Sequence, residues 1–101
     1  MDYTVEYSQG AANQLVELYT YILQDSSAKT AQRYIDNLVE YCDSLALFPH
    51  RGNCRDDILP GLRITHYRKR TIIAFVIREK AVTVTGIWYG GRDHEAHLLT
   101  E

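Results

Sequence analysis

The chain has 101 residues, of which 46% are hydrophobic and 24% charged, and its formal net charge is −2. A chain of this size holds one domain with a real core and has little room for a second. No apolar run approaches the roughly 20 residues that span a bilayer, and the N-terminal residues lack the basic and long apolar regions of a signal peptide. We therefore expect a single domain over residues 1–101, located in the cytoplasm and without a membrane partner.

The N-terminal part of the chain has a net negative charge and the C-terminal part a net positive one. Residues 1–62 contain four Lys or Arg against nine Asp or Glu, whereas residues 63–101 contain seven against four. Two solvated faces of opposite sign would give this pattern, and so would a basic surface that meets an acidic partner or phosphates. The sequence pI of about 6.0 speaks against strong, non-specific binding of nucleic acid.

The two cysteines, Cys42 and Cys54, lack metal-type spacing. Reduced thiols are therefore expected, with a disulfide between them as the alternative. The sequence contains no residues at metal-ligand spacing, no phosphate-binding loop and no nucleophile triad. We expect neither a metal nor a cofactor.

The first expected elements are a strand and a helix. Tyr3, Val5 and Tyr7 alternate with polar residues, which predicts a short strand at an edge or paired with the C-terminal sheet. Ser8 is a good N-cap for a helix over residues 9–25. The apolar residues of that helix recur at helical spacing: Ala11, Leu15, Leu18 and Ile22.

A second helix is predicted over residues 28–47. Either Ser26 or Ser27 can cap it, and its apolar residues step by four, three, four and three from Ala31 to Leu45. Two helices joined by so short a connection must be antiparallel neighbours.

Turn-forming residues fill positions 49–61, and we expect an irregular loop after Pro49 stops the second helix. Ile58 and Leu59 are expected to tuck under this loop and anchor it. Three strands are predicted to follow, over residues 62–67, 71–77 and 81–89.

The middle strand of these three has no polar alternation, which is typical of a strand buried on both faces. Gly86 interrupts the last strand, and Ile87 is out of phase with Val82 and Val84. A β-bulge accounts for both facts. The tail from Gly90 onward is expected to begin flexible and to end in a helical turn or a frayed end.

These elements predict an α+β fold with the order β-α-α-β-β-β. The N-terminal strand precedes an antiparallel α-hairpin, which packs on a small antiparallel β-sheet because its apolar stripes need a surface to cover.

Five motifs stand in a particular order along the chain. They are Ala11-x-x-x-Leu15-x-x-x-Tyr19-x-Tyr21-Ile22, Ala31-x-x-Tyr34, Leu45-x-x-x-Pro49-x-x-Gly52, Asp57-Ile-Leu-Pro-Gly-Leu-Arg63 and Tyr89-Gly-Gly-Arg-Asp93. In this order they resemble the RelE/ParE superfamily of bacterial toxins from type II toxin–antitoxin modules, and most of all its ParE branch. The resemblance implies the RelE/ParE-like fold and a cognate antitoxin, whose C-terminal segment wraps the toxin and neutralises it.

The superfamily divides by target, and fold alone cannot choose between the targets. RelE-like members cut mRNA in the ribosome, whereas ParE-like members poison DNA gyrase. The RelE-like reaction implies lysines before the first of the three strands, an arginine at its start, another after the last strand, and a tyrosine in the tail. Arg63 and Arg92 match the two arginines.

The other RelE-like groups have no match. The lysine region reads Asn53-Cys54-Arg55-Asp56-Asp57, and the tyrosine position falls near Leu98. His94 or His97 would have to supply a proton donor. The resemblance therefore favours a ParE-like toxin that inhibits DNA gyrase and growth, is not an enzyme and has no catalytic residue.

Two alternatives stay open. One is a RelE-like mRNA endonuclease, dependent on the ribosome, with Arg63, Arg92 and His94 as its catalytic residues. The other is a family member that binds antitoxin but poisons nothing.

Seven residues are candidates for contact with the target: Arg63, Arg68, Arg70, Trp88, Tyr89, Arg92 and Asp93. The first five have a structural alternative. Arg63 would pin the long loop by pairing with Asp56 or Asp57. Residues 68–70 would form a solvated hairpin turn, and the two aromatic residues would be packing residues. Among the helical tyrosines, Tyr21 on the polar face is the candidate for a partner contact.

Overall fold

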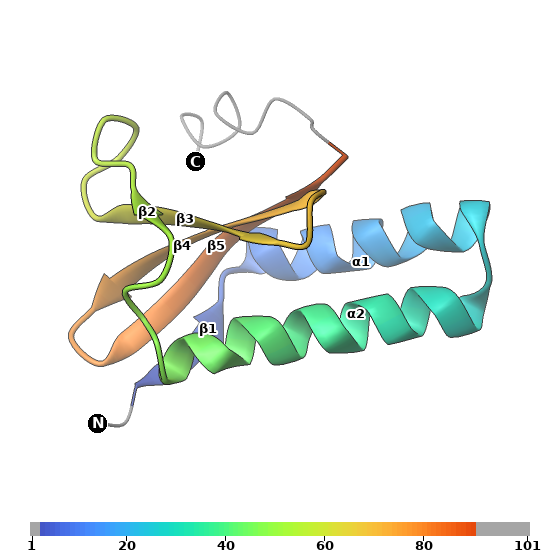
Figure 1. Cartoon of the computed structure of the whole chain (residues 1–101), viewed down its shortest axis with the longest axis horizontal. Coiled ribbons are helices and arrows are strands. Elements are labelled where there is room, and N and C mark those ends of the chain that lie inside the picture. The colour runs from blue at the N-terminus through green and yellow to red at the C-terminus, as the bar shows by residue number, and fades with distance from the viewer. Residues whose placement is uncertain (1–2, 91–101) are drawn as a thin grey trace.

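Five strands form one sheet, and two helices lie across one of its faces (Figure 1). The computed structural model describes residues 3–90. The elements in chain order are β1 (Thr4–Tyr7), α1 (Gln9–Asp25), α2 (Ala28–Asp43), the 3-10 turn η1 (Ser44–Ala46), β2 (Asn53–Cys54), β3 (Leu62–Tyr67), β4 (Thr71–Arg78) and β5 (Ala81–Tyr89). The expected α+β class and the order of its main elements are confirmed.

Serine caps begin both helices, as predicted. The Oγ of Ser8 accepts a hydrogen bond from the N–H of Ala11 at 3.0 Å, and the Oγ of Ser27 accepts one from the N–H of Thr30 at 3.1 Å. Each bond satisfies a donor that the first helical turn leaves open. Of the two serines that could cap α2, the structure uses Ser27.

The second helix is shorter than the predicted span of residues 28–47. It ends at Asp43, and the chain tightens into η1 before Pro49. The Oγ of Ser44 donates to the carbonyl oxygen of Tyr41, and a serine that bonds to nearby backbone in this way competes with the regular helical pattern.

The sheet is mixed, whereas the sequence led us to expect an antiparallel one. Strands β3, β4 and β5 form an antiparallel meander, but β1 pairs parallel with β5, from Thr4 beside Ala81 to Tyr7 beside Val84. The alternation in residues 3–7 predicts a strand but carries no information on its direction. The order across the sheet is β1-β5-β4-β3-β2, so β2, which we did not predict, forms the other edge.

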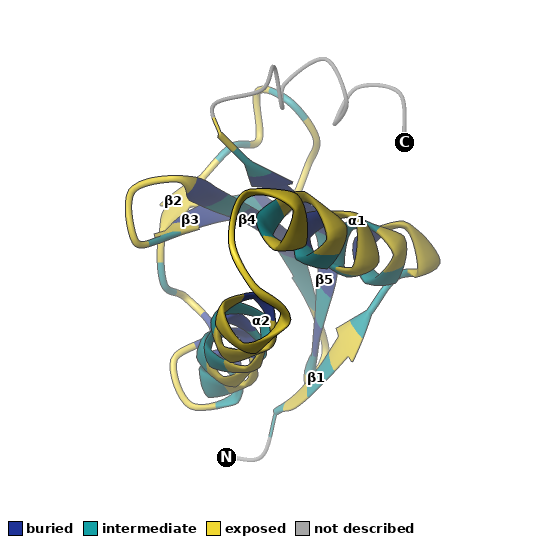
Figure 2. Cartoon of the chain, turned by 90° about the vertical axis from the view of Figure 1, so that its right-hand side faces the viewer, coloured by how far each residue is buried: buried dark blue, intermediate teal, exposed yellow. Residues whose placement is uncertain are grey.

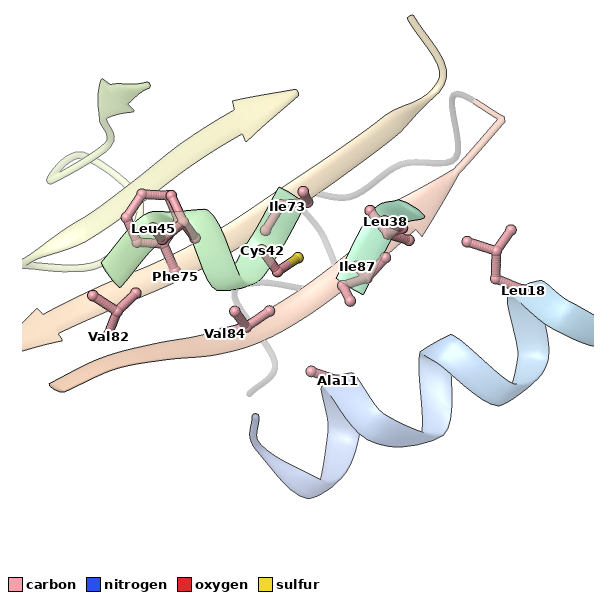
Figure 3. Packing of buried hydrophobic residues seen from close by; sticks show 10 residues of the cluster. All are labelled: Ala11, Leu18, Leu38, Cys42, Leu45, Ile73, Phe75, Val82, Val84 and Ile87. Atoms are coloured by element: carbon pink, nitrogen blue, oxygen red, sulfur yellow. The ribbon is translucent and has the colours of Figure 1, made fainter. Parts of the chain in front are cut away.

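Strand β4 is buried on both faces, as expected for the middle of the sheet. On the helix side, Ile73 and Phe75 join residues of both helices in the main core (Figure 3). On the outer side, Ala74 packs with a second cluster formed by Leu62, Ile64 and Trp88. In Figure 2 the buried residues of the sheet lie in its central strands, whereas the edge strands β1 and β2 and the outer surfaces of the helices carry exposed residues.

The predicted β-bulge is confirmed in β5. Ala74 of β4 lies beside Gly86, and the next residue, Phe75, lies beside Val84, so Thr85 is the extra residue. The bulge keeps Val82, Val84 and Ile87 in the same core on the helix side.

The loop over residues 49–61 is anchored by one of the two residues expected. Ile58 packs against the outer cluster, but Leu59 is 44% exposed, so the expectation for Leu59 was wrong. The predicted form of the tail falls in residues 91–101 and lies outside the described residues. Within residues 3–90, neither helix is long and apolar enough to cross a membrane.

Candidate functional site

Arg63 on β3 holds the preceding loop in place. Its Nε donates to the carbonyl oxygen of Arg51 at 3.1 Å, and its Nη2 donates to the carbonyl oxygen of His50 at 2.6 Å. Its Nη1 lies 2.8 Å from the Sγ of Cys54. These bonds use most of the guanidinium donors. The side chain therefore binds residues 50–54 of its own chain.

The carboxylates that we expected to pair with Arg63 have other partners. Asp57 accepts two hydrogen bonds from Arg55, both 3.0 Å long, and this contact lowers the pKa of the Asp57 carboxyl. Asp56 accepts a bond from the N–H of Gly61 at 2.8 Å. Arg63 therefore pins the loop as predicted, but through backbone oxygens and a thiol.

The hairpin tip between β3 and β4 presents three exposed cations: Arg68, Lys69 and Arg70. Arg68 has a left-handed backbone with φ of 56°, and its guanidinium carbon lies 5.2 Å from the ring centre of Tyr67. The carbonyl oxygen of Arg70 accepts a hydrogen bond from the N–H of Gly90 at 3.0 Å. The tip is thus tied to the end of β5.

The two aromatic candidates on β5 face opposite sides of the sheet. Trp88 is 1% exposed and belongs to the outer cluster. Tyr89 packs on the helix side, with its ring centre 5.5 Å from that of Tyr21 and 5.9 Å from that of Tyr34. Both are therefore packing residues, which was the structural alternative.

Five tyrosines form a continuous row between the helices and the sheet: Tyr21, Tyr89, Tyr34, Tyr67 and Tyr41. Two hydroxyls in this row form hydrogen bonds with buried threonines of the sheet. The hydroxyl of Tyr34 lies 2.5 Å from the Oγ1 of Thr71, and that of Tyr41 lies 3.1 Å from the Oγ1 of Thr65. Burial raises the pKa of Tyr34. This row could not be predicted from the sequence, because its members come from separate elements.

A hollow of about 280 Å³ lies between α1 and the end of β5. Seven residues line it: Gln14, Glu17, Leu18, Tyr21, Ile87, Tyr89 and Gly90. The Oε1 of Gln14 accepts a hydrogen bond from the backbone N–H of Ile87 at 2.8 Å. Tyr21, the predicted partner contact, is 51% exposed at this hollow. Tyr89 was expected to contact the target. The other lining residues were not predicted as site residues, since helical spacing does not reveal which strand end a helix will meet.

The remaining candidates lie beyond the described residues. Arg92 and Asp93 were expected to contact the target, and His94 or His97 to donate a proton in the nuclease alternative. None of the four can be placed relative to Arg63.

Across residues 3–90, no three His, Cys, Asp or Glu side chains come together as a metal site. The two cysteines are free thiols, with Cys42 buried and Cys54 exposed. Burial, together with the Asp43 charge, raises the pKa of the Cys42 thiol to about 12.

Comparisons with known proteins point to one family. The family model described as the ParE toxin of the type II toxin–antitoxin system parDE matches residues 5–94. Among solved structures, one chain of the chromosomal ParDE TA system from P. aeruginosa has the same fold, with a TM-score of 0.75 at 20% sequence identity. That match covers 86% of this chain and 95% of the other. No curated protein matches the sequence.

Proposed function

Given that the chain belongs to the ParE toxin family of type II toxin–antitoxin systems, we propose that it is a cytoplasmic inhibitor of DNA gyrase. It binds gyrase without acting as an enzyme, leaves cleaved DNA behind, and is neutralised by a cognate antitoxin.

The hydrogen bonds of Arg63 are the observation that favours gyrase over mRNA as the target. An arginine that stabilises a cleaving phosphate needs free donors aimed at the substrate, whereas Arg63 directs its donors to His50, Arg51 and Cys54. The loop beside it carries Asp56 and Asp57, and their negative charge disfavours a phosphate chain. Both facts support a toxin that acts by binding.

The exposed cations of the hairpin tip are the proposed target contact on the described part of the chain. Arg68 and Arg70 project from a turn fixed at both ends by strands. Arg92 and Asp93 follow shortly after β5, whose end is bonded to this tip. We therefore assign these four residues to the gyrase-binding surface.

The test is a supercoiling and DNA-cleavage assay with purified gyrase and the chain freed of antitoxin. We expect loss of supercoiling and accumulation of cleaved DNA. The double variant Arg68→Glu/Arg70→Glu and the single variant Arg92→Glu should lose this activity while remaining folded. Lys80→Glu, at the opposite hairpin turn between β4 and β5, is the matched control and should inhibit like the parent.

A folded protein that leaves gyrase active would contradict the proposal. Translating ribosomes with mRNA are then the next assay. Cleaved transcripts there, abolished by Arg63→Ala, would indicate the RelE-like endonuclease instead.

A further inference from the structure

The three cations of the hairpin tip, Arg68, Lys69 and Arg70, have no acidic partner in the part of the chain that the structure describes. Within residues 3–90, none of their side chains makes a hydrogen bond or an ion pair. Other arginines behave differently, since Arg55 and Arg63 donate to acceptors of the loop before β3. The cations of the tip therefore keep their N–H donors available to a molecule outside the chain.

The tip is a rigid support for these charges. Tyr67 pairs with Thr71 across β3 and β4, and the hydroxyl of Tyr34 on α2 lies 2.5 Å from the Oγ1 of Thr71. The guanidinium carbon of Arg68 lies 5.2 Å from the ring centre of Tyr67 and 5.9 Å from that of Tyr34. Because these contacts already fix the turn, the tip loses little conformational entropy when it meets a ligand.

The tip lacks the apolar anchor of a protein interface. Protein–protein interfaces have an apolar core, from which lysine is depleted. None of residues 66–71 is an exposed large hydrophobic residue, because Tyr67 packs against the core and Thr71 is fully buried. Three adjacent cations without an apolar anchor are typical of a surface that contacts phosphates.

The charge on the rest of the chain is unfavourable for DNA. The formal net charge is −2, and residues 1–62, which include both helices, contain nine Asp or Glu against four Lys or Arg. Two of these acidic residues, Asp36 and Glu40, are exposed on α2. A phosphate backbone is therefore attracted to the tip and repelled by the helices. This distribution makes binding to free DNA weak and orients the tip toward DNA that another protein holds.

We propose that the hairpin tip binds the phosphate backbone of the DNA that gyrase holds, and that the contacts with gyrase itself lie elsewhere on the chain. The inference rests on the proposed function, because gyrase has to bring the DNA to the tip. Duplex DNA carries about one negative charge per 1.7 Å of helix axis, so several phosphates lie within reach of three adjacent cations. Contacts with phosphates carry no sequence information, so the tip binds DNA of any sequence.

Binding of the full chain to gyrase, measured with and without a linear DNA duplex at several salt concentrations, tests the inference. We expect the duplex to raise the affinity by at least about tenfold at low salt, and to make the slope of log K against log salt more negative by about 2 to 3. Equal affinity and equal salt dependence with and without DNA would overturn the inference and leave the proposed function intact. A chain that binds gyrase in neither case would contradict both.

Removal of the three cations locates the contact. The triple variant Arg68→Gln/Lys69→Gln/Arg70→Gln should lose the gain in affinity that DNA provides and the additional salt dependence, but should bind DNA-free gyrase like the parent. All three side chains are exposed, so the variant should unfold at the same urea concentration as the parent. If the variant binds gyrase equally weakly with and without DNA, the tip contacts an acidic surface of gyrase itself, and the inference is wrong.

The matched control removes the same charge from other exposed positions. Lys29→Gln/Arg33→Gln/Lys80→Gln changes two cations on α2 and one in the turn between β4 and β5, which lies at the other end of the sheet from the tip (Figure 1). This variant should keep the full effect of DNA on its affinity for gyrase. An equal loss in the control and the tip variant would show that net charge, and not the tip, determines the effect of DNA.

Discussion

The indole ring of Trp88 lies against Gly86, two residues earlier on the same face of β5. A Cβ built on Gly86 would come within 1.9 Å of the Cη2 atom of Trp88. The glycine that marks the β-bulge therefore also makes room for the largest side chain of the outer cluster.

Gly86→Ala should lower the free energy of unfolding by about 2 kcal/mol or more, because an added methyl group overpacks this contact. Urea unfolding measures the change. In the double variant Gly86→Ala/Trp88→Leu the loss should be smaller than the sum of the single losses, since the clash is removed. Gly61→Ala is the comparison, because a Cβ there meets open space and only the φ of +83° opposes it. Its cost should be about 1 kcal/mol.

Arg63→Met should destabilise the chain by about 2 kcal/mol, since several carbonyl acceptors of the loop lose a charged donor at once. Arg78→Met, at the exposed end of β4, removes the same charge and should change stability by less than about 0.5 kcal/mol. Equal effects of the two substitutions would show that the loop does not depend on Arg63. Proteolysis within residues 50–54 should increase in the Arg63 variant alone.

Tyr34→Phe should cost about 1–2 kcal/mol, because it leaves the fully buried hydroxyl of Thr71 without its partner. The double variant Tyr34→Phe/Thr71→Val removes both polar groups with little change of shape, and its stability should return close to that of the parent. Tyr21→Phe serves as the control, since its side chain is half exposed. A double variant as unstable as Tyr34→Phe would contradict this account.

The buried thiol of Cys42 predicts a loss of stability at alkaline pH. Its pKa is raised to about 12 in the folded chain, whereas an unfolded cysteine titrates near about 8.5. The unfolded chain therefore loses the proton first, so stability is complete below about pH 8.5 and falls as the pH rises toward 12. Tyr7, whose pKa burial also raises, adds to the fall at the upper end of this range.

Thiol labelling checks the same point directly. Cys54 is exposed and should react with a thiol reagent at once, whereas Cys42 should react only as the chain unfolds. The Cys54→Ala variant isolates the slow reaction. Rapid labelling of Cys42 in that variant at pH 8 would be inconsistent with its burial.

Local chemistry made much of the fold predictable. A serine before a helix, or a glycine that shifts the phase of a strand, acts on its immediate neighbours, so Ser8, Ser27 and Gly86 could be interpreted from the sequence. The errors in sheet topology concern contacts between distant segments. The parallel direction of β1 and the pairing of β2 depend on where the chain returns, which a strand's own residues do not encode.

The candidate site was less predictable for the same reason. Arg63 was correctly expected to pin a loop, but its acceptors are backbone oxygens, which every residue carries and no pattern singles out. The hollow beside β5 combines side chains from α1 with a strand some 70 positions later in the sequence (Gln14 and Ile87 are 73 apart). Only the folded chain brings them together.

The two sides of the sheet carry different natural chromophores. The chain's one tryptophan lies in the outer cluster, whereas six of its eight tyrosines pack against the core on the helix side: Tyr3, Tyr7, Tyr34, Tyr41, Tyr67 and Tyr89. Tryptophan emission therefore reports on the outer surface of the sheet, and tyrosine signals in the near-ultraviolet report on the contact with the helices. One unlabelled sample can thus reveal whether the two surfaces come apart in a single step or in sequence.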